Sequence, residues 1–235
     1  MENIMTSSDY RRVARENLQD NYWQSVLVSF VAMLLGGLIA GTNMFSISID
    51  ADVIEQLPGF LVRYLSILAS ISGILSLVRF IIGGTIQLGY SRYLLNQHNH
   101  AHLDIHELFS QFDRFKEGFL QSFLRGLYTF LWTLLFIIPG VIKTYAYAMT
   151  PFIMAENPDM TAKEAIEASK QMMDGHKWEL FVLSLTFIGW NLLAGLTLNI
   201  GHIFLNPYVD AAFAAFYKNI SAGSEPNPER AYAEA

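Results

Sequence analysis

Four ionisable side chains lie inside stretches that are otherwise apolar: Arg79, Arg125, Lys143 and Asp210. A charge near the centre of a bilayer costs about 2.5–3.5 kcal/mol, so each should face protein or water and have a partner. Helix rise counted from the neighbouring turns puts Asp210 near mid-depth and Arg125 about 10 Å from one side, within reach of each other. Two interpretations stay open: a polar cavity that binds a lipid headgroup or an anionic solute, and an ion pair of Asp210 with Arg125 or Arg79 that only fixes helix packing.

A histidine-rich run, HNHAHLDIHE, is the second candidate for chemistry. Its histidines are His98, His100, His102 and His106. His102 and His106 have the i, i+4 spacing of zinc or nickel ligands if a helix begins early. Asp104, however, is typical of a helix N-cap and would leave the first three in a linker. We therefore expect a solvated connector, with no metal and no cofactor.

Other functional classes have little support in the sequence. The chain has no cysteine, and it carries no nucleophile elbow, metal triad or phosphate-binding loop. Its net charge is -6, and its cations occur in small groups without a basic stripe, which argues against a nucleic-acid partner. We expect a protein that is not an enzyme, with membrane lipids and a membrane protein as its partners.

The composition indicates a helical membrane protein. Of the 235 residues, 52% are hydrophobic and 15% charged, and the mean hydropathy is +0.30, which is too apolar for an ordinary soluble domain. The apolar runs predict six transmembrane spans, at about 22–41, 65–92, 118–138, 141–156, 178–197 and 202–219. A four-span alternative joins 134–156 into one kinked helix and makes 178–200 the last span.

The distribution of lysine and arginine predicts the orientation. Cations cluster before the first span, between spans two and three, between four and five, and after six. The positive-inside rule therefore places both termini in the cytoplasm and residues 42–64 outside, in a multi-pass protein of the cell membrane. Tight outer turns are expected at Pro139-Gly140, where the proline ends the third span, and at 199–201, with Lys143 near the outer interface.

The polar connectors predict three amphipathic helices at the membrane surface. Thr161 and Glu164 have the spacing of a capping box at the start of one. Another is an aromatic-rich helix after Asp104, and the third, near the N-terminus, aligns Tyr10, Val13, Ala14 and Leu18. Five residues of the first two helices are candidate contacts for a partner protein: Phe109, Phe112, Phe115, Met172 and Met173.

An internal repeat is the third element of the predicted architecture. A shift of 61 residues pairs Gly140 with Gly201, Tyr147 with Tyr208 and Phe152 with Phe213 without a gap. The fold class is therefore all-α: six transmembrane helices with three interfacial helices in pseudo-threefold repeats. The predicted units are 8–95, 103–157 and 161–220, in one transmembrane domain at 1–220, and 221–235 is a disordered cytoplasmic tail.

Several longer strings resemble a known family. FIIPGVIKTYAYAM, MAENPDMTAKEAI, GHKWELFVLSLTFIGW and NPYVDAAFAAFYKNI are similar to a bacterial family of uncharacterised integral membrane proteins, domain-of-unknown-function family 975. That family is similar at a distance to the membrane domain of some glycerophosphodiester phosphodiesterases, whose catalytic barrel has no counterpart in these strings. The resemblance implies location and fold, and no catalytic chemistry.

Two functional hypotheses follow. In the first, the protein binds or moves a lipid or another amphiphile, because of its internal charges and the prolines in its return spans. In the second, it is a membrane scaffold or regulatory subunit that docks a partner through its cytoplasmic interfacial helices. A cavity lined by Arg125 and Asp210 would favour the first, and a dry, paired interior the second.

Overall fold

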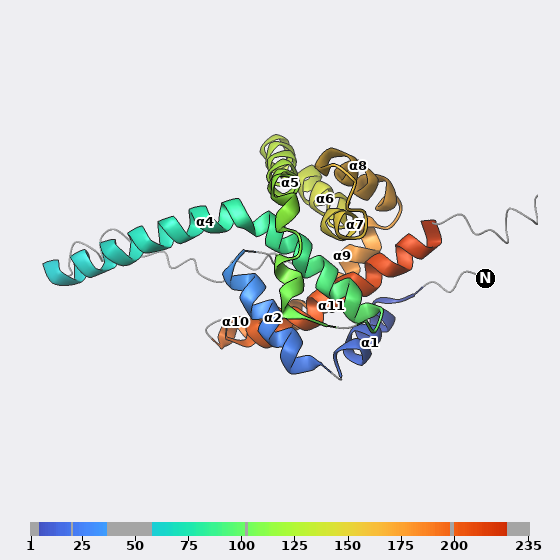
Figure 1. Cartoon of the computed structure of the whole chain (residues 1–235), viewed down its shortest axis with the longest axis horizontal. Helices are drawn as coiled ribbons and strands as arrows, with labels where there is room; N and C mark the ends of the chain where they lie inside the picture. The colour runs from blue at the N-terminus through green and yellow to red at the C-terminus, as the bar shows by residue number, and fades with distance from the viewer. Residues whose placement is uncertain (1–4, 20, 37–57, 102, 198–199, 225–235) are drawn as a thin grey trace, which may run out of the picture.

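The computed structural model describes residues 5–19, 21–36, 58–101, 103–197 and 200–224, and every regular element within them is helical (Figure 1). This confirms the all-α class. The elements are α1 (Ser7–Leu18), α2 (Tyr22–Leu34), α4 (Gly59–His98), η1 (Ile105–Phe109), η2 (Phe112–Arg114), α5 (Phe115–Leu135), α6 (Ile137–Ala146), α7 (Thr150–Glu156), α8 (Ala162–Met172), α9 (Lys177–Thr186), α10 (Ile188–Leu196) and α11 (Gly201–Ser224).

Within the described residues, two helical stretches have the length and composition to cross a membrane, Gly73–His98 and Lys177–Leu196. The apolar helix α2 is shorter, since it ends at Leu34, and the rest of the expected first span, at 37–41, lies outside the described residues. Helix α4 is longer than the expected span: its 40 residues correspond to about 60 Å. Its N-terminal part projects away from the other helices (Figure 1).

The turn after the third expected span lies at Phe136, and the prediction that Pro139 ends this span is wrong. Phe136 has extended backbone angles, φ -155° and ψ 139°, and α6 begins directly after it. Pro139 lies in the first turn of α6, where a missing N–H breaks no intrahelical hydrogen bond. Gly140 is inside the same helix and is needed for close packing, because a Cβ there would lie 2.7 Å from the Cα of Thr133.

Two of the remaining expected spans are interrupted. The segment 141–156 is divided between α6 and α7 by an irregular stretch at 147–149, and Pro151 lies in the first turn of α7. The segment 178–197 is divided between α9 and α10 at Phe187. Helix α11 is continuous although it contains Pro207, and it extends through residues 221–224, so the prediction of a disordered tail is wrong for these four residues. Residues 225–235 lie outside the described part.

Helix α1 packs against α11 inside the protein. Its apolar residues Tyr10, Ala14 and Leu18 are buried, the Tyr10 ring meets Phe216 edge-on at 5.3 Å, and the Asn219 amide donates to the Tyr10 hydroxyl at 2.8 Å. The expectation that this face lies in the headgroup layer is wrong, because protein covers it.

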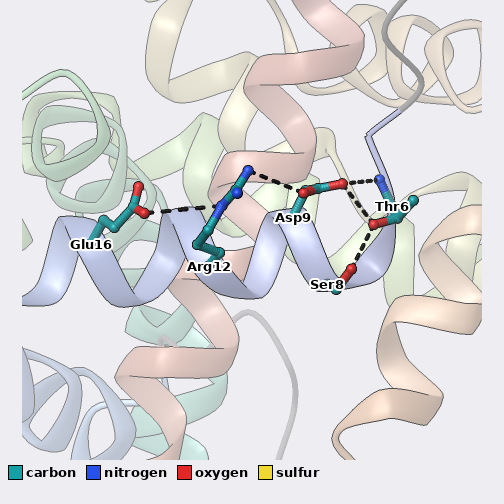
Figure 2. A network of polar contacts seen from close by, with 5 residues as sticks. All are labelled: Thr6, Ser8, Asp9, Arg12 and Glu16. Atoms are coloured by element: carbon teal, nitrogen blue, oxygen red, sulfur yellow. Dashed lines mark hydrogen bonds and ion pairs between the residues drawn. The ribbon is translucent and has the colours of Figure 1, made fainter.

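The opposite face of α1 is polar, and its first turn is closed by a capping box (Figure 2). The Thr6 backbone N–H and hydroxyl both donate to Asp9 Oδ2, at 2.9 and 2.6 Å. These two bonds, the hydroxyl bond first, lower the pKa of Asp9. Arg12 Nη2 lies 3.1 Å from Asp9 Oδ1. The row of polar contacts therefore belongs to the solvent-facing side of the helix.

The two polar connectors keep their predicted start signals. Thr161 caps α8, and its capping box with Glu164 is confirmed. The Asp104 side chain accepts from the His106 N–H at 2.9 Å, which confirms it as an N-cap. The helices themselves differ from the prediction, because residues 105–114 form two short 3₁₀ turns, and the apolar face of α8 is buried against protein instead of lipid.

Glycines let α4 approach its neighbours at backbone distance. A Cβ on Gly118 of α5 would lie 2.7 Å from the Thr85 hydroxyl oxygen and 2.8 Å from its Cα, and a Cβ on Gly84 would collide with the Gly118 carbonyl. A Cβ on Gly89 would likewise collide with the Leu108 carbonyl of η1. Small residues at such crossings are typical of helices packed in membranes.

We predict that Gly84→Ala destabilises the protein by about 1–3 kcal/mol, because the methyl group would force α4 and α5 apart. Gly73→Ala is the matched control in the same helix, since no atom lies within 4 Å of its Cβ position. The control should be neutral or slightly stabilising, because alanine is the better helix former. The measurement is the thermal unfolding midpoint in detergent, and equal midpoints for the two variants would contradict the close crossing.

Candidate functional site

A cavity of about 780 Å³ lies among α5, α6, α9, α10 and α11. Hydroxyl, amide and guanidinium groups line it together with aromatic rings. Its lining residues are Ser122, Arg125, Gly126, Thr129, Phe130, Thr144, Tyr145, Ala148, Ser184, Phe187, Asn191, Asn206, Val209 and Phe213. Among these described residues Arg125 alone carries a charge at neutral pH. The Thr144 and Ser184 hydroxyls and the Asn191 amide each donate to a nearby backbone carbonyl, so the guanidinium is the main feature that the cavity offers to a ligand.

Arg125 stands halfway along α5, about 15 Å from either end at 1.5 Å per residue. Its Nη2 donates to Gln87 Oε1 of α4 at 2.8 Å. Gln121, one turn earlier in α5, donates to the same oxygen at 3.3 Å. Because the partner is a neutral amide, the guanidinium is held in place without an opposite charge beside it. It can therefore still attract an anion.

Three helix irregularities meet at the cavity. Ala148 belongs to the irregular stretch between α6 and α7, Phe187 to the joint between α9 and α10, and Asn206 precedes Pro207 in α11. The backbone at two of these irregularities is paired: Ala148 N–H donates to Tyr145 O, and Phe187 N–H donates to Ser184 O while its carbonyl accepts from Asn191. The irregularities therefore shape the cavity wall, and the side chains supply its polar groups.

Asp210 belongs to a different interface. Its side chain is fully buried and accepts a hydrogen bond of 3.0 Å from the Tyr90 hydroxyl of α4. The α11 residues that line the cavity are Asn206, Val209 and Phe213. Arg125 and Asp210 are not among the ion pairs of the described residues, so the expected pair between them does not form.

A short polar chain continues from Tyr90 along α4. The Tyr93 ring stacks on Tyr90 with centroids 6.5 Å apart. The Tyr93 hydroxyl lies 3.1 Å from Ser25 Oγ of α2, and Gln97 Nε2 donates to the same oxygen at 2.7 Å. These contacts join α2, α4 and α11 through polar groups inside the protein.

The other two internal cations have local partners. Arg79 Nε donates to the Leu34 carbonyl at 2.7 Å and so satisfies the C-terminal end of α2. The Lys143 ammonium lies 4.8 Å from the centre of the Trp132 ring, in a cation–π contact. The four ionisable residues singled out from the sequence therefore occupy four separate places, and only Arg125 reaches the cavity.

The aromatic candidates form an exposed row. Phe109, Phe112 and Phe115 are 46%, 40% and 36% exposed, and their neighbouring ring centroids are 5.9 and 6.5 Å apart. Met172 is half-buried, and Met173 is fully buried in the core. Met173 is therefore not accessible to a partner, whereas the three phenylalanines are.

The described histidines do not form a metal site, although two of them line one cleft. Asn17 Nδ2 lies 3.2 Å from His98 Nδ1, and His98 and His100 line a small cleft with Lys218. His106 belongs to η1, and His102 lies outside the described residues. Within the described part, no three histidine, aspartate or glutamate side chains converge as metal ligands would.

Several site residues were missed at the sequence level, above all Gln87 and Gln121 and the polar lining of α5. A usable signal existed, because Ser122, Arg125 and Thr129 follow i, i+3, i+7 spacing and so share one helix face. Gln87 had no such signal, since it lies on another helix and meets Arg125 only through the crossing of α4 and α5.

Residues 134–224, from the end of α5 through α11, match the model of a family described as "Protein of unknown function (DUF975)". Neither a curated protein nor a solved structure matches the chain. The match supports the family resemblance and covers the cavity walls from α6 to α11. It does not include Arg125.

We predict that Tyr90→Phe destabilises the protein by about 1–3 kcal/mol, because a buried carboxylate loses a donor. Tyr93→Phe is the control, since this tyrosine is equally buried on the same helix but its partner Ser25 keeps the bond from Gln97. The control should lose about 0.5–1.5 kcal/mol. Chemical denaturation in detergent measures both, and an equal or larger loss in the control would contradict the role given to Tyr90.

Proposed function

We propose that the protein is a non-enzymatic, multi-pass protein of the cell membrane that binds the polar or anionic headgroup of a lipid or other amphiphile around Arg125. The observation that carries this proposal is the polar cavity halfway along α5, with one charged lining residue held by a neutral amide. The proposal includes a distant similarity to the membrane domain of glycerophosphodiester phosphodiesterases. This similarity bears on the membrane location and not on the headgroup that is bound.

The exposed surface supports a membrane setting. Large apolar side chains are freely exposed around the turn between α5 and α6 and along α10; for example, Leu134, Ile137 and Leu196 are 74%, 74% and 81% exposed. Soluble monomers rarely leave so much contiguous apolar surface in water, whereas lipid tails would cover it without cost. The C-terminal halves of α4 and α11 instead pack into a buried core.

The six proposed crossings are α2, α4, α5, α6–α7, α9–α10 and α11, and two helical hairpins support the last four of them. Gly140 of α6 packs against Thr133, and Gly201 of α11 packs against Ala194, with Cβ-to-Cα distances of 2.7 and 2.8 Å. Both members of the second pair lie 61 residues after those of the first. The same local packing at the repeat spacing is what duplicated hairpins would have.

The chemistry of the cavity favours an anionic or strongly polar headgroup. A guanidinium binds phosphate or carboxylate oxygens through several N–H groups at once. The Asn191 amide donates one hydrogen to Phe187 O and has a second N–H that can complete the hydrogen bonds of such a group. Interrupted helices at membrane depth are tolerated where they line a cavity, as they do at Ala148 and Phe187.

A scaffold or regulatory role remains the second candidate, with the row of Phe109, Phe112 and Phe115 as its contact surface. The three rings are exposed and adjacent at one end of α5. Aromatic residues are enriched at the centres of protein interfaces. In this alternative a partner protein, and not lipid, covers the row. The row then lies on the cytoplasmic side, together with both termini.

Native mass spectrometry of the gently solubilised protein tests the lipid-binding proposal. The wild type should retain an anionic phospholipid, and Arg125→Ala should lower this retention at least about tenfold, since a charge-assisted pair is worth about 1.5–3 kcal/mol. Lys143→Ala is the matched control, because it removes the same charge from a site outside the cavity. Equal retention by Arg125→Ala and Lys143→Ala would count against the Arg125 site, provided both variants elute as folded protein.

Single cysteines test the number of crossings, and the chain offers a clean background because it contains no cysteine. With six spans, Lys163→Cys is cytoplasmic, so an impermeant maleimide should label it only after the membrane is opened. With four spans the same position is outside. Gly59→Cys and Ser110→Cys serve as outside and inside controls, because both arrangements place them identically. Labelling of Lys163→Cys in intact cells would refute the six-span proposal.

A further inference from the structure

A second, mostly apolar groove of about 580 Å³ runs between the α1–α2 corner and the hairpin of α10 and α11. It is lined by Arg15, Leu18, Gln19, Tyr22, Trp190, Leu193, Ala194, Thr197, Gly201, Phe204, Leu205 and Tyr208. The volume is within the range of small-molecule sites. Arg15 is the one charged residue of this described lining, and it forms no ion pair with another described residue.

The groove opens onto the apolar surface of the protein. Leu193 and Phe204 line it and are also exposed, and Leu196 on the same hairpin is more exposed still. An apolar chain in the groove would therefore be continuous with a surrounding lipid layer. The polar edges of Tyr22, Trp190 and Tyr208 suit the boundary between an acyl chain and a headgroup.

Two aromatic rings separate this groove from the Arg125 cavity. Phe187 lines the cavity and Tyr208 lines the groove, and their rings meet edge-to-face with centroids 5.4 Å apart. Arg11 of α1 holds the pair: its guanidinium lies 5.8 Å from the Phe187 ring centre, and its Nε donates to the Tyr208 hydroxyl at 3.4 Å. The two hollows are therefore distinct, although they share one wall.

From this arrangement we infer that the groove is a second lipid site, which holds an acyl chain of an anionic phospholipid between α1 and α10 with its phosphate on Arg15. The apolar lining excludes a purely polar solute, and the guanidinium, which has no ion-pair partner among the described residues, selects an anionic over a zwitterionic headgroup. This inference rests on the proposed lipid contact of the exposed apolar surface and not on the number or direction of the crossings, and it assigns a site separate from the one at Arg125.

The test uses native mass spectrometry of the full-length protein exchanged into detergent with phosphatidylglycerol or phosphatidylcholine. The background is Arg125→Ala, so that a retained lipid does not report the cavity. Arg15→Ala should lower phosphatidylglycerol retention about fivefold, which is the effect of one cation near a bilayer surface, and leave phosphatidylcholine unchanged.

Leu193→Trp should lower retention of both lipids at least about tenfold, because the larger ring fills the groove. If the acyl chain loses the burial of only two methylene groups, the binding constant already falls by about this factor. Leu192→Trp is the control, since this neighbour is 68% exposed and does not line the groove. It should behave like the Arg125→Ala background. Because Leu193 is 58% exposed, its replacement is compatible with folding.

Two results would overturn the inference. One is equal retention of phosphatidylglycerol by Arg15→Ala, Leu193→Trp and Leu192→Trp in folded protein. The other concerns the two single variants, Arg15→Ala and Arg125→Ala. If the wild type retains one lipid and each variant loses it completely, the groove and the cavity are one site. Failure of the Arg125 proposal is a separate outcome, in which Arg125→Ala alone retains as much lipid as the wild type while the groove variants still lose it.

Discussion

The close crossing of α4 and α5 at Gly84 and Gly118 is the constraint on which the candidate site depends. With no Cβ on either residue, the two backbones touch. One turn further along each helix, Gln87 then meets Gln121, and one turn beyond that it meets Arg125. A larger residue at the crossing would separate the helices and leave the guanidinium without its amide partner. Backbone contact thus fixes a charge that no opposite charge neutralises.

Helix α11 divides the interior into three environments. One face, with Asn206, Val209 and Phe213, lines the polar cavity. A second, with Gly201, Phe204 and Tyr208, forms a wall of the apolar groove. Asp210 lies on a third side, toward Tyr90 of α4. A continuous helix can serve all three because successive residues turn by about 100°. This is why the Asp210 carboxylate does not pair with the Arg125 guanidinium.

Local signals in the sequence predicted local structure well. The Thr161–Glu164 capping box and the Asp104 N-cap are both present, because these bonds join residues two or three positions apart. Pro139-Gly140 was misread as a turn for a related reason. A proline in the first helical turn and a proline after the last one look alike in sequence, and only the extended backbone at Phe136 distinguishes them. Gly140 serves a contact with Thr133, which spacing alone does not reveal.

The sequence by itself determined that the chain is helical and apolar, which faces of its short helices are apolar, and that Arg125 needs a polar setting. The tertiary structure decided what covers each face. The apolar sides of α1 and α8 are covered by other helices, while those of α10 and the phenylalanine row stay open. Hydrophobic periodicity records that a face avoids water, and it is the same whether protein or lipid excludes that water. The partner of Arg125 was likewise undetermined, because it lies on a helix that only folding brings near.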